Sequence, residues 1–236
     1  MIKDNILRIR QRIASVCARI NRDPAAILIV AVSKARTVDE IEEATSAGVT
    51  DIGENRVQEA LAKYNDMRYA IPACRQAGCD MPIRWHMVGH LQTNKVKDAV
   101  RIFDVIQSVD SIRLAQEIDK QAAKINKIQD ILIEVKTSGE TAKFGLDPEA
   151  AVGAIKEITK LKNINLKGLM TIAPLADNPE KARPYFQMLK KLRDGVNAIC
   201  DKRYAIRDLS MGMTDDFEVA IEEGATMVRL GRAIFE

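Results

Sequence analysis

Lys34 follows a run of apolar residues, at the point where the chain leaves an expected buried strand. Residues 27–33, ILIVAVS, are rich in the β-branched side chains typical of strands, and the ammonium of Lys34 comes directly after them. An amine partly removed from water has its charged form disfavoured, so more of it is the free amine that attacks a carbonyl. Lys34 is therefore a candidate for an imine bond. A solvated lysine, or an ion pair with Glu54, explains the same residue equally well.

Two segments that contain glycine lie at the ends of the last two expected strands. They are SMGMT at residues 210–214 and RLGRA at residues 229–233. A phosphate group needs backbone N–H donors that can approach closely, and a side chain at the wrong position blocks that approach. We expect Thr214 to cap the next helix, and Asp215 and Asp216 must then point away from a bound anion. Each glycine alone indicates a turn, but the two segments together favour a phosphate site.

The remaining reactive side chains indicate no second chemistry. His86 lies inside an expected strand and His90 at its end, where hydrogen-bonded histidines are more common than metal ligands or general bases. Cys74 and Cys79 are separated by four residues, and no second pair follows at a zinc spacing. We expect these cysteines to be reduced thiols without a metal.

The elements that must position Lys34 and the two glycine segments alternate regularly along the chain. Eight apolar segments rich in Val and Ile are separated by seven segments of helical periodicity, after a first amphipathic helix with apolar residues at 2, 6, 9, 13, 16 and 20. This pattern predicts an α/β fold, a TIM-type (β/α)8 barrel with an extra N-terminal helix in a single domain over residues 1–236. An open doubly wound sheet has the same alternation and stays an alternative. The expected strands are residues 27–33, 49–54, 83–89, 105–110, 131–137, 166–173, 208–213 and 227–231.

Local signals predict where some helices begin and end. Asp147 followed by Pro148 predicts an N-cap and a first-turn proline, and Gly48 predicts a left-handed helix end. Residues 65–82 contain two prolines and a glycine, and we interpret them as an insertion between a helix and a strand.

Composition excludes several classes of protein. The 236 residues carry 36 basic and 33 acidic side chains, a net charge of +3 that does not favour nucleic-acid binding. The N-terminus interleaves charged and apolar residues, unlike a signal peptide, so we expect a cytoplasmic protein. The longest uncharged apolar run is too short to cross a bilayer, and no membrane segment is expected.

The motifs AVSKART, IGENRVQEALAKY, RWHMVGHLQTNKVK, KGLMTIA and LSMGMTDDFEVAIEEGATMVRLGRAIF resemble those of the YggS/PROSC family, the pyridoxal phosphate homeostasis proteins. The resemblance implies a fold type III barrel, like the N-terminal domain of alanine racemase, that binds pyridoxal 5'-phosphate as an imine on Lys34. It implies that Arg229 faces the pyridine nitrogen and that Asn55 lies near the cofactor. The phosphate contacts that it implies, mostly through backbone N–H groups, come from Ser210, Met211, Gly212, Gly231 and Arg232.

Four positions depart from the family pattern or extend it. Arg36 stands where the family often has a second lysine, and a guanidinium cannot form an imine. His90 replaces a proline at the expected rim of the pocket, and Arg232 replaces a hydroxyl residue with a guanidinium that can add a phosphate contact. Lys143 is expected near the mouth of the barrel as a secondary, solvated lysine.

Three functions are consistent with these residues. The first is a protein that holds pyridoxal phosphate reversibly for vitamin B6 homeostasis, as a monomer, with little turnover and with cofactor-dependent apoenzymes as recipients. The second is an amino-acid racemase, disfavoured because the sequence ends five residues after the last expected strand and lacks the β-domain of alanine racemase. The third is an aldolase or isomerase in which Lys34 reacts with a phosphorylated substrate and no cofactor is present. Arg229 favours the first, because a residue that donates a hydrogen bond but no proton leaves the pyridine ring a weak electron sink.

Overall fold

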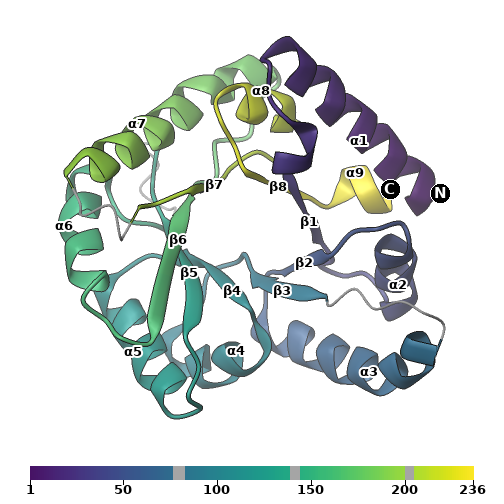
Figure 1. Cartoon of the computed structure of the whole chain (residues 1–236), viewed down its shortest axis with the longest axis horizontal. Coiled ribbons are helices and arrows are strands. Elements are labelled where there is room, and N and C mark those ends of the chain that lie inside the picture. Colours follow the sequence, from purple (N-terminus) through teal and green to yellow (C-terminus); the bar gives the residue numbers. More distant parts are fainter. Residues whose placement is uncertain (77–82, 139–143, 200–204) are drawn as a thin grey trace.

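The computed structural model describes residues 1–76, 83–138, 144–199 and 205–236, and its strands form one closed parallel barrel (Figure 1). Each strand pairs with the next along the chain, and the last pairs with the first. The predicted TIM-type barrel is confirmed, and the open sheet is excluded. The strands are β1 (Leu28–Val32), β2 (Asp51–Glu54), β3 (Arg84–Met87), β4 (Val105–Val109), β5 (Gln129–Glu134), β6 (Ile164–Met170), β7 (Asp208–Ser210) and β8 (Met227–Leu230).

Helices surround the barrel, and one or more lie between each pair of successive strands. A short helix that was not predicted, α9, follows β8. The helices are α1 (Ile2–Arg19), α2 (Val38–Ser46), α3 (Val57–Gln76), α4 (Val96–Ile102), α5 (Ile112–Ala123), α6 (Pro148–Ile158), α7 (Arg183–Ile199), α8 (Phe217–Glu222) and α9 (Arg232–Phe235), with 3-10 turns at Pro24–Ala26, Thr93–Lys95 and Pro179–Ala182.

The N-terminal helix α1 completes the outer layer beside two short helices, α8 and α9. Its apolar stripe is buried at residues 2, 6, 9, 13 and 16, as the periodicity predicted, but Ile20 lies at the C-cap and is exposed. Asn5 Nδ2 donates to Ile234 O of α9 at 3.0 Å, and the Arg12 guanidinium lies over the Phe217 ring of α8 at 4.6 Å. The two chain ends therefore lie on the same side of the molecule (Figure 1).

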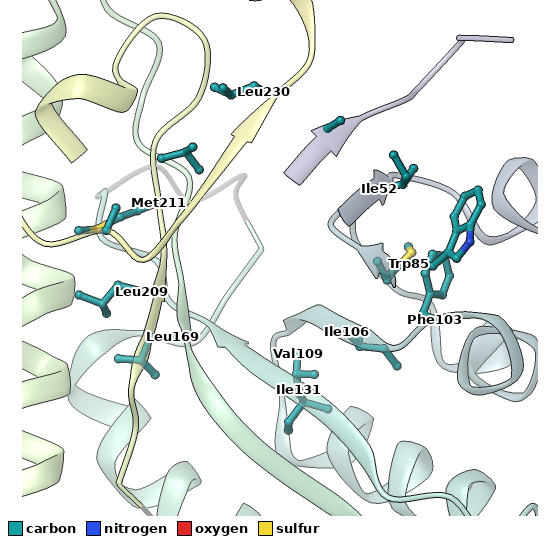
Figure 2. Packing of buried hydrophobic residues seen from close by; sticks show 14 of the residues in the cluster. Ile52, Trp85, Phe103, Ile106, Val109, Ile131, Leu169, Leu209, Met211 and Leu230 are labelled. Atoms are coloured by element: carbon teal, nitrogen blue, oxygen red, sulfur yellow. The ribbon is translucent and has the colours of Figure 1, made fainter. Parts of the chain in front are cut away.

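The main hydrophobic core lies between the strands and the helices. It is one continuous cluster, which we call the outer core, and it includes Phe103, Phe186 and Phe217, each with no exposed surface. Figure 2 shows side chains of this cluster on successive strands, from Ile52 and Trp85 to Leu209 and Leu230.

The interior of the barrel contains a much smaller apolar cluster. Val105, Leu132, Met170 and Met227 are buried there, with Leu28 and Ile172 packed against them. On the same strands, closer to the carboxyl ends, interior positions hold polar residues such as Gln107, Glu134 and Arg229, because alternate residues of a strand point to the same side.

Several local predictions differ from the structure. Residues 65–76, predicted as part of an insertion, continue helix α3, and residues 77–82, with Cys79, lie outside the described residues. Strand β5 begins and ends earlier than predicted, because the Lys136 N–H bonds Leu146 O outside the ladder. Asp147 occupies the N-cap position of α6 as predicted, but its side chain pairs with Lys136 at 3.4 Å instead of capping the helix. Gly48 has φ +84, which confirms the left-handed end of α2.

Two further findings concern the classes of protein considered above. Within the described residues, no helix combines the length and the apolar character needed to cross a bilayer. In the same part of the chain, no three His, Cys, Asp or Glu side chains are grouped as metal ligands would be.

Candidate functional site

The carboxyl ends of the strands bring Lys34 and the two glycine segments to one face of the barrel. Lys34 follows β1, and Ala35 after it has φ +57, a conformation that turns the chain sharply and that residues with a side chain seldom adopt. Lys34 is exposed. The expectation that its ammonium is partly desolvated is therefore wrong.

A second lysine takes the carboxylate that was considered as a partner for Lys34. Lys63 Nζ of α3 donates to Glu54 Oε1 at 2.6 Å and to Ser33 O at 2.6 Å, and Ser33 Oγ donates to the same carboxylate oxygen at 2.6 Å. Glu54 is fully buried, and its Oε2 has no hydrogen-bond partner among the described residues. Lys63 thus fixes the backbone before Lys34 and leaves the Lys34 amine to the mouth of the barrel.

The turns after β7 and β8 present unused N–H groups. In the described part of the chain, the N–H groups of Gly212, Gly231 and Arg232 have no acceptor. Gly212 has φ +92, and a Cβ there would lie 2.5 Å from the Cβ of Ala220, so a side chain is excluded. Met211 differs, because its N–H bonds Met227 O at 3.1 Å and its side chain fills the outer core. We therefore leave Met211 out of the anion site.

The carboxylates beside these turns accept from donors other than the N–H groups of Gly212, Gly231 and Arg232. Asp216 Oδ1 accepts from the Met213 N–H at 2.6 Å, and Asp215 Oδ2 accepts from Arg232 Nη2 at 2.5 Å. Thr214 was predicted to cap α8, but it does not. Its hydroxyl accepts from the Ala233 N–H at 3.3 Å instead. The Arg232 guanidinium is thus held by Asp215, while its backbone N–H stays available.

A chain of hydrogen bonds crosses the barrel interior below the mouth, and we call it the polar chain. Arg229 Nη1 lies 2.7 Å from Ser210 Oγ, which lies 2.6 Å from Gln107 Oε1. Gln107 Nε2 lies 2.8 Å from His86 Nδ1, and His86 Nε2 lies 2.7 Å from Asp51 Oδ1. All five residues are buried, which agrees with the expectation of a hydrogen-bonded histidine at position 86.

Arg229 and the neighbouring Glu134 are both buried, and both have shifted pKa values. Burial lowers the pKa of Arg229 to about 10, against the opposing effect of Glu134 and Asp216. Burial raises the pKa of Glu134 to about 7, although the Arg229 charge acts in the opposite direction. Arg229 Nη2 also donates to Thr171 O at 2.8 Å, so this guanidinium is positioned from two sides.

The rim of the mouth contains His90 and Asn55. His90 Nδ1 lies 3.2 Å from Asp110 Oδ2, and its ring stacks on Phe144 with 3.6 Å between ring centroids. Asn55 is half-buried at the end of β2, and its backbone leaves no room for a side chain at Gly89. Lys143 lies outside the described residues.

Sequence reasoning missed four residues of this region: Asp51, Lys63, Gln107 and Glu134. Asp51, Gln107 and Glu134 lie at polar positions within otherwise buried strands. A polar residue in such a strand is a signal in itself, because it needs a partner inside the barrel. Lys63 is one of many lysines on helices and gives no comparable signal.

Known proteins match this sequence over nearly its whole length. The alanine racemase N-terminal domain family matches residues 2–236. A pyridoxal phosphate homeostasis protein of Aquifex aeolicus is 41% identical over 232 residues, which cover 98% of this chain and 96% of that protein. The chain belongs to the pyridoxal phosphate homeostasis protein family.

Solved structures agree with this family assignment. PipY of Synechococcus elongatus, solved with pyridoxal phosphate bound, aligns with a TM-score of 0.85 and 30% identity over 100% of both chains. The alanine racemase of Clostridium difficile, at 18% identity and a TM-score of 0.74, shares the fold; the match covers 98% of this chain and 59% of the racemase.

Proposed function

We propose that this chain binds pyridoxal 5'-phosphate at the carboxyl ends of the barrel strands and serves vitamin B6 homeostasis with little or no catalytic turnover. The observation that carries the proposal is the pairing of an exposed lysine after β1 with three unused backbone N–H groups after β7 and β8. An amine and an anion site on one face suit a ligand with an aldehyde and a phosphate. The homeostasis proteins and PipY, which match over nearly the whole chain, support this ligand.

Each part of the site has a role in this proposal. Bound pyridoxal phosphate supplies an aldehyde and an electron-withdrawing ring. Lys34 would hold the aldehyde as an imine, and the N–H groups of Gly212, Gly231 and Arg232 would hold the phosphate. Asn55, at the rim, would lie beside the ring. Ser210 would act through its bond to Arg229, because its own hydroxyl is buried and already donates to Gln107.

Arg229 limits the chemistry that the ring could support. A guanidinium with a pKa of about 10 stays charged at neutral pH, so it would donate a hydrogen bond to the pyridine nitrogen and give up no proton. The ring then withdraws electrons weakly, and turnover of free amino acids should be slow. We propose that the protein stores the cofactor and passes it to cofactor-dependent apoenzymes, and that it does so as a monomer with one domain.

The test is to locate the covalent bond. Purified protein loaded with pyridoxal phosphate should be yellow, and reduction with borohydride followed by mass spectrometry should find the pyridoxyl group on Lys34. Lys34→Arg keeps the positive charge but cannot form the bond, so it should lose the colour, whereas Lys136→Ala, at a lysine that follows β5, should keep it. A colourless wild-type protein, or a label elsewhere, would overturn the proposal.

A racemase remains the second candidate, because the family match is to the N-terminal domain of alanine racemase. Loaded protein should racemise free amino acids no faster than pyridoxal phosphate alone. Racemisation at an ordinary enzyme rate would favour the second candidate, and the same samples serve both experiments.

A further inference from the structure

The polar chain has a single possible direction, which is set by Arg229. A guanidinium can only donate, so Nη1 donates to Ser210 Oγ. The one hydroxyl proton of Ser210 then goes to Gln107 Oε1. The NH2 of Gln107 consequently faces His86 and donates to Nδ1, so Nδ1 must carry a lone pair and no proton. The ring proton of His86 therefore lies on Nε2 and is donated to Asp51.

The opposite orientation of the Gln107 amide fails for a specific reason. Its NH2 would point at Ser210 Oγ, which already accepts from Arg229, and the hydroxyl proton of Ser210 would lose its acceptor in the chain. Water cannot replace that acceptor, because Ser210, Gln107 and His86 have no exposed surface. Buried polar groups are almost always hydrogen-bonded, so the observed direction is the one that the interior enforces.

Asp51 completes the chain as an anion. Burial raises the pKa of its carboxyl, but the hydrogen bonds from His86 and Thr50 and the nearby Arg84 guanidinium offset that effect, and the net pKa is lowered. The chain thus begins at a cation and ends at an anion, with three neutral groups between them. It needs no further proton to satisfy its hydrogen bonds.

We infer that Gln107 and His86, anchored by Asp51, are positioning residues that hold Ser210 and thereby orient the Arg229 guanidinium toward the mouth of the barrel. Ser210 and Thr171 O occupy one N–H of each terminal nitrogen of Arg229. Arg229 Nε donates to no described residue. The side chain is thereby fixed with a donor left for a ligand. The role toward a pyridine nitrogen rests on the proposed function, but the direction of the chain does not.

The first experiment measures the tautomer of His86 in the protein without cofactor. The chain has two histidines, so ring ¹⁵N spectra contain two ring systems, and His90→Gln identifies the one that belongs to His86. We expect a neutral ring with a slowly exchanging proton on Nε2. A ring protonated on Nδ1, or on both nitrogens at neutral pH, would overturn the inferred direction.

The second experiment breaks the polar chain at Ser210, which reaches His86 only through Gln107. Ser210→Ala removes the group that fixes the Gln107 amide, so the amide can turn its oxygen toward His86 Nδ1 while Nε2 keeps its bond to Asp51. A His86 ring protonated on both nitrogens should then become populated at neutral pH. Unchanged protonation of the ring in this variant would show that Ser210 does not transmit the orientation, which overturns the inference.

The third experiment connects the chain to the ligand. Gln107→Met keeps the size of the side chain but interrupts the chain, and we expect at least ten-fold weaker pyridoxal phosphate binding and a shifted visible band. The matched control is Gln129→Met, which removes another fully buried amide, one that donates to Phe103 O and Asp104 O, and should change affinity less than two-fold.

The outcomes separate this inference from the proposed function. If wild-type protein binds pyridoxal phosphate on Lys34 but Gln107→Met leaves affinity and band unchanged, the positioning role is wrong and the proposed function stands. If wild-type protein binds no pyridoxal phosphate, the proposed function and the role toward the ring both fail, while the His86 spectra still decide the direction of the chain.

Discussion

The outer core and the interior of the barrel are built from the same eight strands but have opposite compositions. The outer core is one uninterrupted apolar cluster that includes three fully buried phenylalanines. The interior has four buried apolar residues, and beyond them the polar chain, Glu134 and the mouth. The contrast indicates that the outer core provides most of the folding free energy, whereas the interior provides the positioned polar groups on which function depends.

The largest expected effect is on the outer core. Phe103→Ala should lower the free energy of unfolding by about 3–5 kcal/mol, because it removes a large buried side chain and leaves a cavity. Urea denaturation measures this. The matched control is Phe144→Ala at the exposed rim, expected within about 0.5 kcal/mol of wild type. Equal losses at the two positions would contradict the division between core and mouth.

The interior should respond to pH in a way that the outer core does not. The pKa of Glu134 is raised to about 7 from an ordinary 4.5, so folding favours the protonated carboxyl. The stabilisation that this provides is complete below pH 4.5 and is lost as pH rises through 7. Glu134→Gln should therefore become more stable than wild type between pH 5 and 8, by up to about 3 kcal/mol.

The comparison for Glu134 is a pair of unfolding curves, wild type and variant, at each pH. A difference that stays constant from pH 5 to 8 would show that Glu134 titrates at its ordinary value, and that the interior does not desolvate it.

Glycine at position 212 should matter for both stability and binding. Gly212→Ala places a Cβ 2.5 Å from Ala220 in a backbone with φ +92, which should cost about 1–3 kcal/mol of stability and distort the anion site. Gly153→Ala in α6 is the control, because its Cβ would meet nothing within 4 Å and the residue lies outside the anion site. Phosphate affinity measured by calorimetry should fall only for the first variant; an equal fall for both would contradict the role of close approach at Gly212.

The smallest effect on stability is expected at Lys34. Lys34→Ala removes an exposed side chain after β1 and should change the free energy of unfolding by less than about 0.5 kcal/mol. Thermal or urea unfolding checks this on the same samples that lose the visible colour. A large destabilisation would mean that Lys34 has a structural role.

The sequence predicted the elements better than the interior network. Strand and helix periodicity is a local signal, and all eight strands and the first helix were found from it. Lys34 was identified because it directly follows the apolar residues 27–33, whose composition alone marks where β1 ends. The predicted start of β5 was too late, because Gln129 and Asp130 are polar yet belong to the ladder with Ile164 and Asn165.

The polar chain could not be predicted from one sequence. Asp51 and Ser210 are 159 positions apart, and only the register of the closed barrel brings them into one network with Gln107. Local reasoning also failed at Thr214, because the loop folds its hydroxyl onto α9 instead of the next helix. Such contacts depend on how distant segments pack.

The most direct test is a crystal structure of the protein loaded with pyridoxal phosphate. We predict a bond between Lys34 Nζ and the aldehyde carbon, phosphate oxygens within hydrogen-bonding distance of the Gly212, Gly231 and Arg232 N–H groups, and the ring nitrogen facing Arg229. A phosphate bound away from the turns after β7 and β8, or a Lys34 amine that makes no bond to the ligand, would contradict the account.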